Sequence, residues 1–475
     1  MRPTTTPQHD VLIIGGGPGG AVAAIALARK GLRVVVLEKS PFPRFHIGES
    51  LVPHTYTLLR QLGLEQAALR LPHVPKTGAE FAMGDATLDR TSRFTFDQAY
   101  IPGSKTLNVE RASFDAMLLA EAGAAGADVR EGPAAGVKQI VRLADGDVAV
   151  LTQGGEEITA KYLIDASGQG TVVGRHLGTK RPEKSRCFRK VAYFAHFQNV
   201  RRLPGDEAGH PAIAMCEEGW FWIINIDEKR TSIGLVLDAE AAKRAGVPAD
   251  RMLAWGIARC PMVRERMSEA TGPQGNEVIS NFSYRCRPYA GPGYFLVGDA
   301  AAFIDPIFST GVYVATVGAL QAAEKILAIL DGRFSPRRAA SQYVRFLEGG
   351  TRVYFRLIRQ YYDHSFRELF LNGDGPHQMR GAVLAALAGH VFPKPIWAIR
   401  WRLALFDLFI RINRWKPLVP RRERVSLFAT DADSASVPSP LYSGERVRVR
   451  GAFCTSEEQK APHREPSPLS TGERE

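Results

Sequence analysis

Residues 11–39 constrain the fold more strongly than any other part of the chain. They contain a short β-branched apolar run, a turn with Gly15, Gly17 and Gly20, an alanine-rich helical run, and a second apolar run that ends at Glu38. Glycines in such a turn let the backbone approach a pyrophosphate at the positive end of a helix, and an acid after the second strand can bind ribose hydroxyls. The spacing predicts a βαβ unit that binds a dinucleotide. It does not separate NAD from FAD.

The remaining chain predicts both helices and strands. Apolar residues make up 45% and charged residues 23% of the 475 residues, as in ordinary globular proteins, and this length suggests about three domains. Helices are expected at about 53–63 and 111–126, and from Gly298 to about Trp415. Strand-like patterns cover 78–108, 136–164, 187–236 and 277–286, which predicts an antiparallel sheet beside the parallel one.

Charge and composition exclude several classes of protein. The formal net charge is +12, but about half of the excess lies between residues 395 and 424, and no nucleic-acid-binding module is recognisable, so no nucleic acid partner is expected. No run of 18 apolar residues predicts a transmembrane segment, and residues 1–10 lack a secretory signal, so a cytoplasmic location is expected. Five scattered cysteines predict neither a disulfide framework nor a thiolate metal site.

Two later segments resemble flavin-binding elements. Asp165-Ala-Ser-Gly168 follows one apolar run, and Gly298-Asp299 ends another just before a helix. With the glycine turn, they resemble the FAD family that includes aromatic hydroxylases, geranylgeranyl reductases and flavin-dependent halogenases. The resemblance implies FAD as cofactor, with Asp299 accepting a hydrogen bond from the ribitol chain and Arg111 contacting the flavin.

Two segments are similar to those of the flavin-dependent halogenases in particular. Residues 43–53 resemble the segment that reaches the isoalloxazine, and the Phe-x-x-Pro-x-x-Ser-x-Gly pattern of 303–311 resembles the halide and flavin loop. The resemblance implies that backbone N–H groups at Thr310 and Gly311 hold a halide, as a helix start with a glycine can do. A packing turn beside the cofactor is the alternative interpretation.

Lys76, just before a predicted strand, resembles the lysine that receives hypohalous acid in this family and either hydrogen-bonds it or forms a haloamine. A buried amine suits that role because desolvation favours its neutral, nucleophilic form. Trp220 and Trp222 resemble the tryptophans that separate substrate from flavin, although a spacing of two also fits one core face of a strand.

Two positions depart from the family pattern. Asn225 stands where the family has proline after the tryptophans, which implies a relaxed wall or a divergent branch. Phe308 stands where tryptophan-specific members have glutamate, which favours a phenol-type or pyrrole-type substrate over free tryptophan. The helical segments 361–370 and 382–392 resemble halogenases that act on phenols or on carrier-bound rings.

The resemblance therefore implies a defined set of site residues. Catalytic roles are implied for Lys76, Trp220, Trp222 and Ser309. Cofactor-binding roles are implied for Gly15, Gly17, Gly20, Glu38, Lys39, Gly48, Glu49, Ser50, Arg111, Asp165, Gly168, Gly298, Asp299, Pro306, Thr310 and Gly311. The halide is assigned to Thr310 and Gly311.

The implied reaction is halogenation of an electron-rich aromatic ring, either free or attached to a carrier protein. Reduced FAD from a separate flavin reductase, O₂, and chloride or bromide would yield hypohalous acid, which Lys76 delivers. Asn225 keeps open a flavin-dependent monooxygenase or a geranylgeranyl-reductase-like oxidoreductase. A flavoprotein without chemistry, acting as a scaffold, is an alternative of another class.

The expected fold is α/β: a Rossmann-like FAD-binding domain of the glutathione reductase type, an antiparallel β-sheet substrate domain and C-terminal helices. The FAD-binding domain is assigned to 1–185 and 277–330, with 75–108 contributing to the substrate side. The substrate domain is assigned to 186–276, the helical region to 331–425 and a disordered tail to 426–475. Within the helical region, 396–415 is predicted to be a core-packed helix with a solvated face; peripheral contact with a membrane or an acidic carrier protein is the alternative.

Overall fold

The computed structural model describes residues 7–83, 91–102, 105–183, 189–280, 283–303, 305–373, 375–422, 425–429 and 448–449. Its first sheet has a parallel centre, in which β1 (His9–Ile14) lies between β2 (Val34–Glu38) and β10 (Glu157–Asp165). The path continues from β2 to β7 (Asp128–Glu131), and from β10 to β19 (Tyr294–Leu296) and β18 (Ala290–Gly291). Antiparallel β9 (Asp147–Thr152) and β8 (Val137–Ala144) extend β10. This arrangement confirms the predicted βαβ unit.

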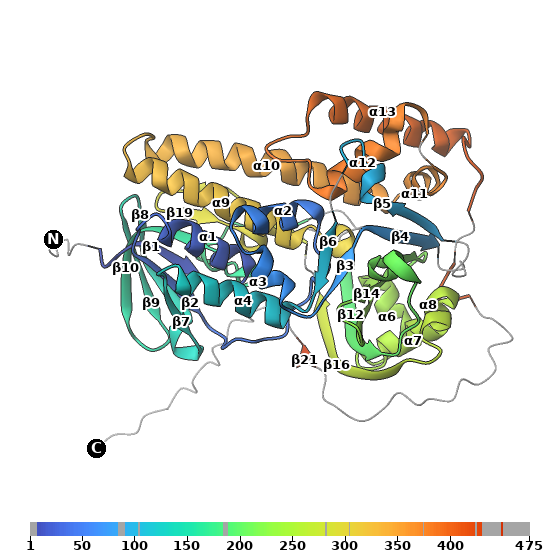
Figure 1. Ribbon diagram of the computed structural model, residues 1–475, viewed down its shortest axis with the longest axis horizontal. Helices are drawn as coiled ribbons and strands as arrows, with labels where there is room; N and C mark the ends of the chain where they lie inside the picture. Colours follow the sequence, from blue (N-terminus) through green and yellow to red (C-terminus); the bar gives the residue numbers. More distant parts are fainter. Residues whose placement is uncertain are drawn as a thin grey trace, which may run out of the picture.

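Helices cover the parallel strands and create the core. The apolar residues of β1 and β2 are buried on both faces, as expected for strands inside a parallel sheet. Helix α1 (Pro18–Ala28) packs against α4 (Arg111–Ala124) and α9 (Gly311–Leu330), although these helices are far apart in the sequence (Figure 1). By length and composition α9 could cross a membrane, but it packs between α1 and α10 (Pro336–Tyr361), and most of it is buried.

The second sheet is mainly antiparallel and has the order β21-β16-β12-β15-β14-β13-β4-β5. Its strands are β21 (Arg448–Val449), β16 (Thr271–Ser280), β12 (Lys190–Gln198), β15 (Arg230–Asp238), β14 (Gly219–Asn225), β13 (Ala212–Met215), β4 (Gly78–Met83) and β5 (Ser92–Thr95). Helices α6 (Ala239–Ala245), α7 (Met252–Arg259) and α8 (Pro261–Arg266) follow β15. Figure 1 shows these three helices beside the second sheet.

Smaller elements join the two sheets. They are α2 (Pro53–Gln61), α3 (Glu65–Leu69), α5 (Val172–His176), the pair β3 (His73–Lys76) and β6 (Thr106–Val109), and the three-stranded β11 (Lys180–Pro182), β17 (Tyr284–Cys286) and β20 (Ala302–Phe303). After α10 come α11 (His364–Leu371), α12 (Met379–Ala388) and α13 (Trp397–Trp415). The predicted fold class and the helical C-terminal part are confirmed.

Two expected boundaries differ from the structure. Residues 277–280, assigned to the FAD-binding domain, end β16 and pair with β12 of the second sheet. Ser426 and Leu427, assigned to the tail, are held by Glu218: its carboxylate accepts hydrogen bonds from the Ser426 hydroxyl and the Leu427 N–H, and Leu427 is fully buried. Local composition does not reveal these distant partners. Most of the tail lies outside the described residues.

Candidate active site

The glycine turn after β1 has the close approaches that its sequence predicts. Gly15 has φ +99°, and a Cβ there would overlap the carbonyl oxygen of Ala166. A Cβ on Gly20 would overlap the carbonyl oxygen of Gly15. Gly17 caps the start of α1, where the N–H groups of the first turn have no partner within the helix. The turn is therefore a glycine-lined anion cradle at the positive end of a helix.

Glu38 supports this cradle from the end of β2. Its carboxylate accepts hydrogen bonds from Gly16 N–H at 2.8 Å and from Ser40 N–H at 2.9 Å. Lys39 beside it is exposed. A Cβ built on Gly17 would lie 3.6 Å from Nη2 of Arg44, so a guanidinium stands beside the cradle. Sequence reasoning did not single out Arg44, although it lies in the segment 43–53 that was compared with the halogenases.

Arg111 is buried and joins α4 to the segment 47–51. Its guanidinium makes a two-pronged ion pair with Asp115, at 2.8 Å and 2.9 Å, and Nη1 donates to the carbonyl oxygen of Ile47 at 2.7 Å. A Cβ on Gly48, whose φ is +105°, would lie 2.9 Å from Arg111 Nη1. These contacts fix the Arg111 guanidinium in one orientation against the segment that is predicted to reach the flavin.

The carboxylates of the two predicted aspartates, Asp165 and Asp299, differ in their hydrogen bonds. Asp165 accepts from the N–H groups of Ser167 at 3.0 Å and Val173 at 2.7 Å, so it orders the turn after β10, which includes Gly168. The Asp299 carboxylate has no hydrogen-bond partner among the described residues. Burial raises the pKa of Asp299 to about 6, while the Arg111 guanidinium acts to lower it. A ligand hydroxyl would give this carboxylate the donor that it lacks.

These residues fit FAD. The cradle suits a pyrophosphate, Glu38 lies at the end of β2, and the carboxylate of Asp299 is available beside Arg111. Gly298, with φ +60°, packs so closely on α9 that a Cβ would lie 2.8 Å from the Ala315 Cβ. The parts predicted from separate motifs therefore lie together.

Lys76 ends β3 and is buried, with 4% of its surface exposed. Its Nζ donates to the Ser50 hydroxyl and to the Leu51 carbonyl oxygen, both at 2.9 Å, and lies 5.4 Å from the centre of the Phe96 ring. All of these partners are uncharged. Burial lowers the pKa of Lys76 to about 7. Because the segment 47–51 contacts both Lys76 and Arg111, it connects the lysine with the predicted flavin site.

Glu49, in the middle of that segment, is buried and faces the second sheet. Its carboxylate accepts from Gly48 N–H at 2.9 Å and lies 3.3 Å from Nε2 of His196 on β12. Burial acts to raise the pKa of Glu49, but the contact with His196 and the hydrogen bonds from backbone N–H groups together outweigh it, so the pKa is lowered. The Phe45 ring lies 5.2 Å from the His196 ring, so residues 43–50 also pack on β12.

Trp220 and Trp222 lie on one buried face of β14. They belong to the large buried cluster that also contains residues of the first sheet and of the C-terminal helices. Phe221 and Ile223, on the other face of β14, pack in a second cluster with residues of α7 and α8. The two indole rings lie 5.8 Å apart, and Phe194 of β12 lies 5.7 Å from Trp222. The alternation predicted from the sequence therefore holds, and the two tryptophans share one buried cluster with the first sheet and the C-terminal helices.

A relay of hydrogen bonds connects Trp220 with the loop 305–311. Its indole N–H donates to the Tyr362 hydroxyl at 3.0 Å, which donates to the Asp305 carboxylate at 2.7 Å. Asp305 also accepts from Ile307 N–H at 3.1 Å and so caps the 3₁₀ turn Pro306–Phe308. Sequence reasoning missed Tyr362 and Asp305. The Asp-Pro dipeptide was a signal for a capped turn; nothing local pointed to the tyrosine.

The predicted halide loop follows this capped turn. Ser309 has φ +55°, which bends the chain into the start of α9, and its hydroxyl has no partner among the described residues. Thr310 caps α9 and Gly311 is its first residue, so both N–H groups lie at the positive end of a 20-residue helix. Nothing within 4 Å would meet a Cβ on Gly311. The geometry is suited to an anion.

Asn225 has a role that proline could not fill. Its Nδ2 donates to the Ala208 carbonyl oxygen at 2.6 Å, and its Oδ1 accepts from the Thr231 hydroxyl at 2.8 Å. Ala208 lies in the 3₁₀ turn Gly205–Gly209, whose last residue packs directly on the Pro75 carbonyl oxygen. The asparagine thus anchors a turn that covers the strand ending at the predicted catalytic lysine.

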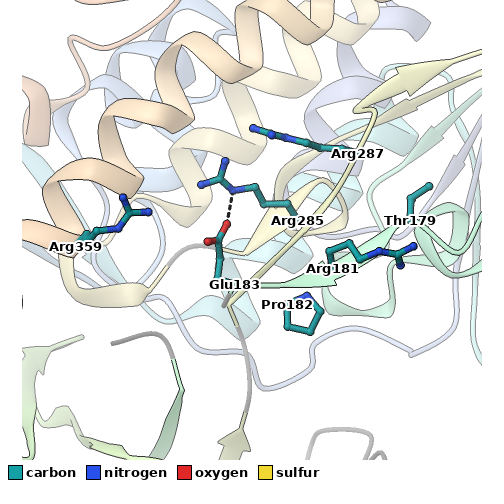
Figure 2. A pocket seen from close by; sticks show the side chains of 7 residues that line it. All are labelled: Thr179, Arg181, Pro182, Glu183, Arg285, Arg287 and Arg359. Atoms are coloured by element: carbon teal, nitrogen blue, oxygen red, sulfur yellow. Dashed lines mark ion pairs between the residues drawn. The ribbon is translucent and has the colours of Figure 1, made fainter. Parts of the chain in front are cut away.

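Two surface pockets lie outside the flavin cradle. The one in Figure 2 has a volume of about 510 Å³ and is lined by Thr179, Arg181, Pro182, Glu183, Arg285, Arg287 and Arg359. Arg285 and Glu183 form an ion pair at 2.6 Å within it, and no predicted site residue lines it. The other, of about 680 Å³, is lined by Glu217, Tyr362, Asp363, His364, Ser365, Arg367, Arg414, Arg421 and Arg422. Through Tyr362 this second pocket borders the tryptophan relay.

Comparison with known proteins identifies the family. The FAD binding domain model matches residues 8–343. The 1H-pyrrole-2-carbonyl-[peptidyl-carrier protein] brominase of Pseudoalteromonas luteoviolacea is 31% identical over 82% of this chain and 94% of its own length. The corresponding chlorinase of Pseudomonas fluorescens is 30% identical over 75% and 84%. A solved flavin-dependent brominase has a TM-score of 0.74 at 29% identity, covering 85% of this chain and 99% of that one. The predicted resemblance is confirmed: this chain belongs to the flavin-dependent halogenases, which are FAD-dependent oxidoreductases.

Proposed function

We propose that this halogenase transfers halogen through Lys76 to an electron-rich ring of phenol or pyrrole type. The observation that carries the proposal is a buried amine whose hydrogen-bond partners are a hydroxyl and a carbonyl oxygen. Among the residues that the structure describes, no carboxylate pairs with this amine, and burial lowers its pKa to about 7. The neutral form is therefore well populated near neutral pH.

The residues that hold FAD are the cradle Gly15–Gly20, Glu38, Arg111 and Asp299, with Arg44 beside the pyrophosphate position. When bound and reduced, FAD supplies the chemistry by which O₂ oxidises chloride or bromide to hypohalous acid. The N–H groups of Thr310 and Gly311 hold the halide at the helix start. We infer that a separate flavin reductase supplies the electrons, because the sequence has a single glycine turn of the dinucleotide type.

The role of Lys76 is that of a nucleophile and carrier. The lone pair of its neutral Nζ attacks the halogen of hypohalous acid, the O–X bond breaks, and water leaves with the proton that Nζ gives up. The aromatic ring then attacks the halogen, the N–X bond breaks, and the proton that the ring loses restores the amine at Nζ. Ser50 and Leu51 orient Nζ through the two hydrogen bonds at 2.9 Å. Trp220 and Trp222 separate the ring from the flavin.

We also propose that the ring arrives attached to a carrier protein. The brominase and chlorinase relatives act on a pyrrole held by a peptidyl-carrier protein. The pocket beside Tyr362 is lined by four arginines against two acidic residues, Glu217 and Asp363, and this net positive charge suits an acidic carrier protein. A free pyrrole carboxylate and its carrier-bound form, offered side by side, distinguish the two cases: a large preference for the bound form supports this part of the proposal.

The test of function supplies the purified protein with FAD, a flavin reductase, NADH, O₂ and bromide, and offers phenols and pyrroles. Mass spectrometry detects the bromine isotope doublet in the product. We expect brominated product from the native chain and none above background from Lys76→Met, with FAD binding and NADH consumption unchanged. Lys161→Met, at a surface lysine paired with Asp10 2.8 Å away, serves as the matched control and should brominate normally.

Each outcome has a defined meaning. Brominated product from Lys76→Met at the native rate would remove the lysine from the mechanism. Hydroxylated product without bromine from the native chain would indicate a monooxygenase, since it would mean that the tryptophan wall fails to keep substrate from the flavin.

A further inference from the structure

Large apolar side chains are exposed in one part of the molecule. Of the eight exposed large hydrophobic residues in the described part of the chain, six lie between 396 and 418. They are Ile396 (54% exposed), Trp397 (74%), Leu408 (50%), Ile412 (38%), Trp415 (91%) and Leu418 (41%). This concentration exceeds what scattered surface hydrophobics explain.

Helix α13, which contains most of them, has two apolar faces. Its inner face carries Ile399, Leu403, Phe406 and Ile410, which are buried where the helix packs on α11 and α12. Its outer ridge carries Trp397, Ala404, Leu408 and Trp415, whose spacings of seven, four and seven residues keep them on one side of a helix. The predicted packed face and an exposed basic stripe are both present, and an exposed apolar ridge lies beside that stripe.

Basic residues flank the outer ridge. Arg400, Arg411 and Lys416 are exposed and form no ion pair with any residue that the structure describes. The single acidic residue of the helix, Asp407, is engaged by Gln360 and Arg356 of α10. Arg414 is paired with Asp363. The exposed side of α13 therefore combines an apolar ridge with uncompensated positive charge and carries no free acid.

We propose that the outer face of α13 binds the surface of an anionic lipid bilayer. An apolar stripe with tryptophan at both ends and arginine or lysine alongside is the pattern of a helix that lies in the plane of a membrane interface. Trp397 and Trp415 are about 27 Å apart along the axis, from 1.5 Å per residue, so the whole helix can lie flat. Figure 1 shows α13 at the outer edge of the molecule, where a flat surface can reach it.

The charges disfavour a second copy as the occupant. In a two-fold interface each copy presents the same patch, so Arg400 and Arg411 of both copies would meet across the ridge without an acidic partner. Anionic headgroups instead supply the opposite charge along the full length of the helix. The bilayer therefore satisfies both the apolar ridge and its basic flanks.

The experiment is co-sedimentation of the full chain with FAD and vesicles of phosphatidylglycerol and phosphatidylcholine in equal parts. We expect binding to these vesicles, much weaker binding to pure phosphatidylcholine, and partial release by high salt. Trp397→Ala with Trp415→Ala should weaken binding by about tenfold or more. Arg400→Gln with Arg411→Gln should weaken binding to the anionic vesicles by about tenfold, and leave binding to phosphatidylcholine unchanged.

The control variant carries Val141→Ala and Leu177→Ala, the other two exposed large hydrophobics among the described residues, and should bind as the native chain does. Retained circular dichroism and flavin absorbance report that each variant is folded. Absence of binding to anionic vesicles overturns the proposal, as does equal binding by the tryptophan variant. A native dimer that the tryptophan variant converts to monomer, without vesicle binding, would assign the face to a second copy and also overturn it.

Discussion

Burial of Lys76 disfavours the protonated form that a lysine side chain normally has in water. An ammonium ion at this position loses its hydration and gains a hydroxyl, a carbonyl oxygen and the face of an aromatic ring in exchange. None of these carries a full negative charge, so burial lowers the pKa to about 7. Near neutral pH the amine is then present in both forms, and the neutral form is the one that the proposed halogen transfer requires.

This lowered pKa predicts a specific pH dependence of stability. Between about 7 and the ordinary value of 10.5, the unfolded chain holds a proton on Lys76 that the folded chain does not. Stability therefore rises with pH over this interval by about 1.4 kcal/mol per pH unit from this group, and falls as the pH is lowered. Lys76→Met lacks this contribution.

Urea unfolding of both proteins over a pH series measures this contribution. The difference in unfolding free energy between native chain and variant should grow in favour of the native chain as pH rises. A difference that does not change with pH would contradict the lowered pKa.

Some residues of the candidate site could be predicted from the sequence and others could not. The glycine cradle, Lys76 and Asp299 lie in short motifs whose residue types and spacing are set by local geometry. Tyr362 could not be found in this way, because its partners Trp220 and Asp305 are 142 and 57 residues away in the chain. In the sequence Asn225 is only a departure from the family pattern, because its hydrogen bonds to Ala208 and Thr231 exist only in the folded sheet.

At the scale of elements, β14 and β15 together form the tryptophan face. Trp222 pairs in register with Gly234, and its indole ring lies directly over the position where that residue has no side chain. The Trp222 indole N–H donates to Ser232 of the same neighbouring strand at 3.0 Å. The alternation of β14 was predictable from its own sequence. The space for the Trp222 ring exists because Gly234 of β15 lies opposite it, and the pairing of β14 with β15 could not be predicted from the sequence.

Gly234→Ala should displace the Trp222 ring. A Cβ at this position would overlap the indole, so the ring or the strand must shift, and overpacking of this kind costs about 1 to 3 kcal/mol. We expect a lower thermal midpoint, a changed tryptophan fluorescence spectrum, and more peroxide released per halogenated product. These are measured by calorimetry, emission spectra and a peroxide assay.

Gly123→Ala is the matched control for a glycine-to-alanine change. It lies in α4, where the nearest atom to a new Cβ is 3.9 Å away, and alanine is the better helix former by about 0.5 to 1 kcal/mol. This variant should be as stable as the native chain or more so. If both variants behave alike, the close fit between Trp222 and Gly234 has no effect on stability.

At the scale of the whole molecule, one relay joins three regions. Trp220 belongs to the second sheet, Tyr362 follows the long helix α10, and Asp305 caps the turn before the helix start proposed to hold halide. Lys190 of β12 lies 4.1 Å from the Tyr362 ring centre and is paired with Asp238 at 2.6 Å. The Tyr362 hydroxyl therefore connects Trp220, proposed to separate substrate from flavin, with the loop proposed to hold the halide.

Tyr362→Phe removes that hydroxyl and leaves the Trp220 indole N–H and one Asp305 oxygen without their partner. Each unpaired buried group costs about 1 to 3 kcal/mol, and a less ordered Asp305 holds the turn before Thr310 less firmly. We expect the KM for bromide to rise by about tenfold, which corresponds to about 1.4 kcal/mol. The affinity for FAD should not change, because the glycine cradle and Arg111 are not part of the relay.

The neighbouring tyrosine provides the control. The Tyr361 hydroxyl is buried and has no hydrogen-bond partner among the described residues, so Tyr361→Phe removes a polar group that gains nothing from folding. This variant should keep the native KM for bromide and be equally or more stable. The two substitutions remove the same atom from adjacent residues of the same type. A rise in the KM for bromide that is confined to Tyr362→Phe can therefore be attributed to the relay, whereas equal effects would mean that the three regions are held together by packing alone.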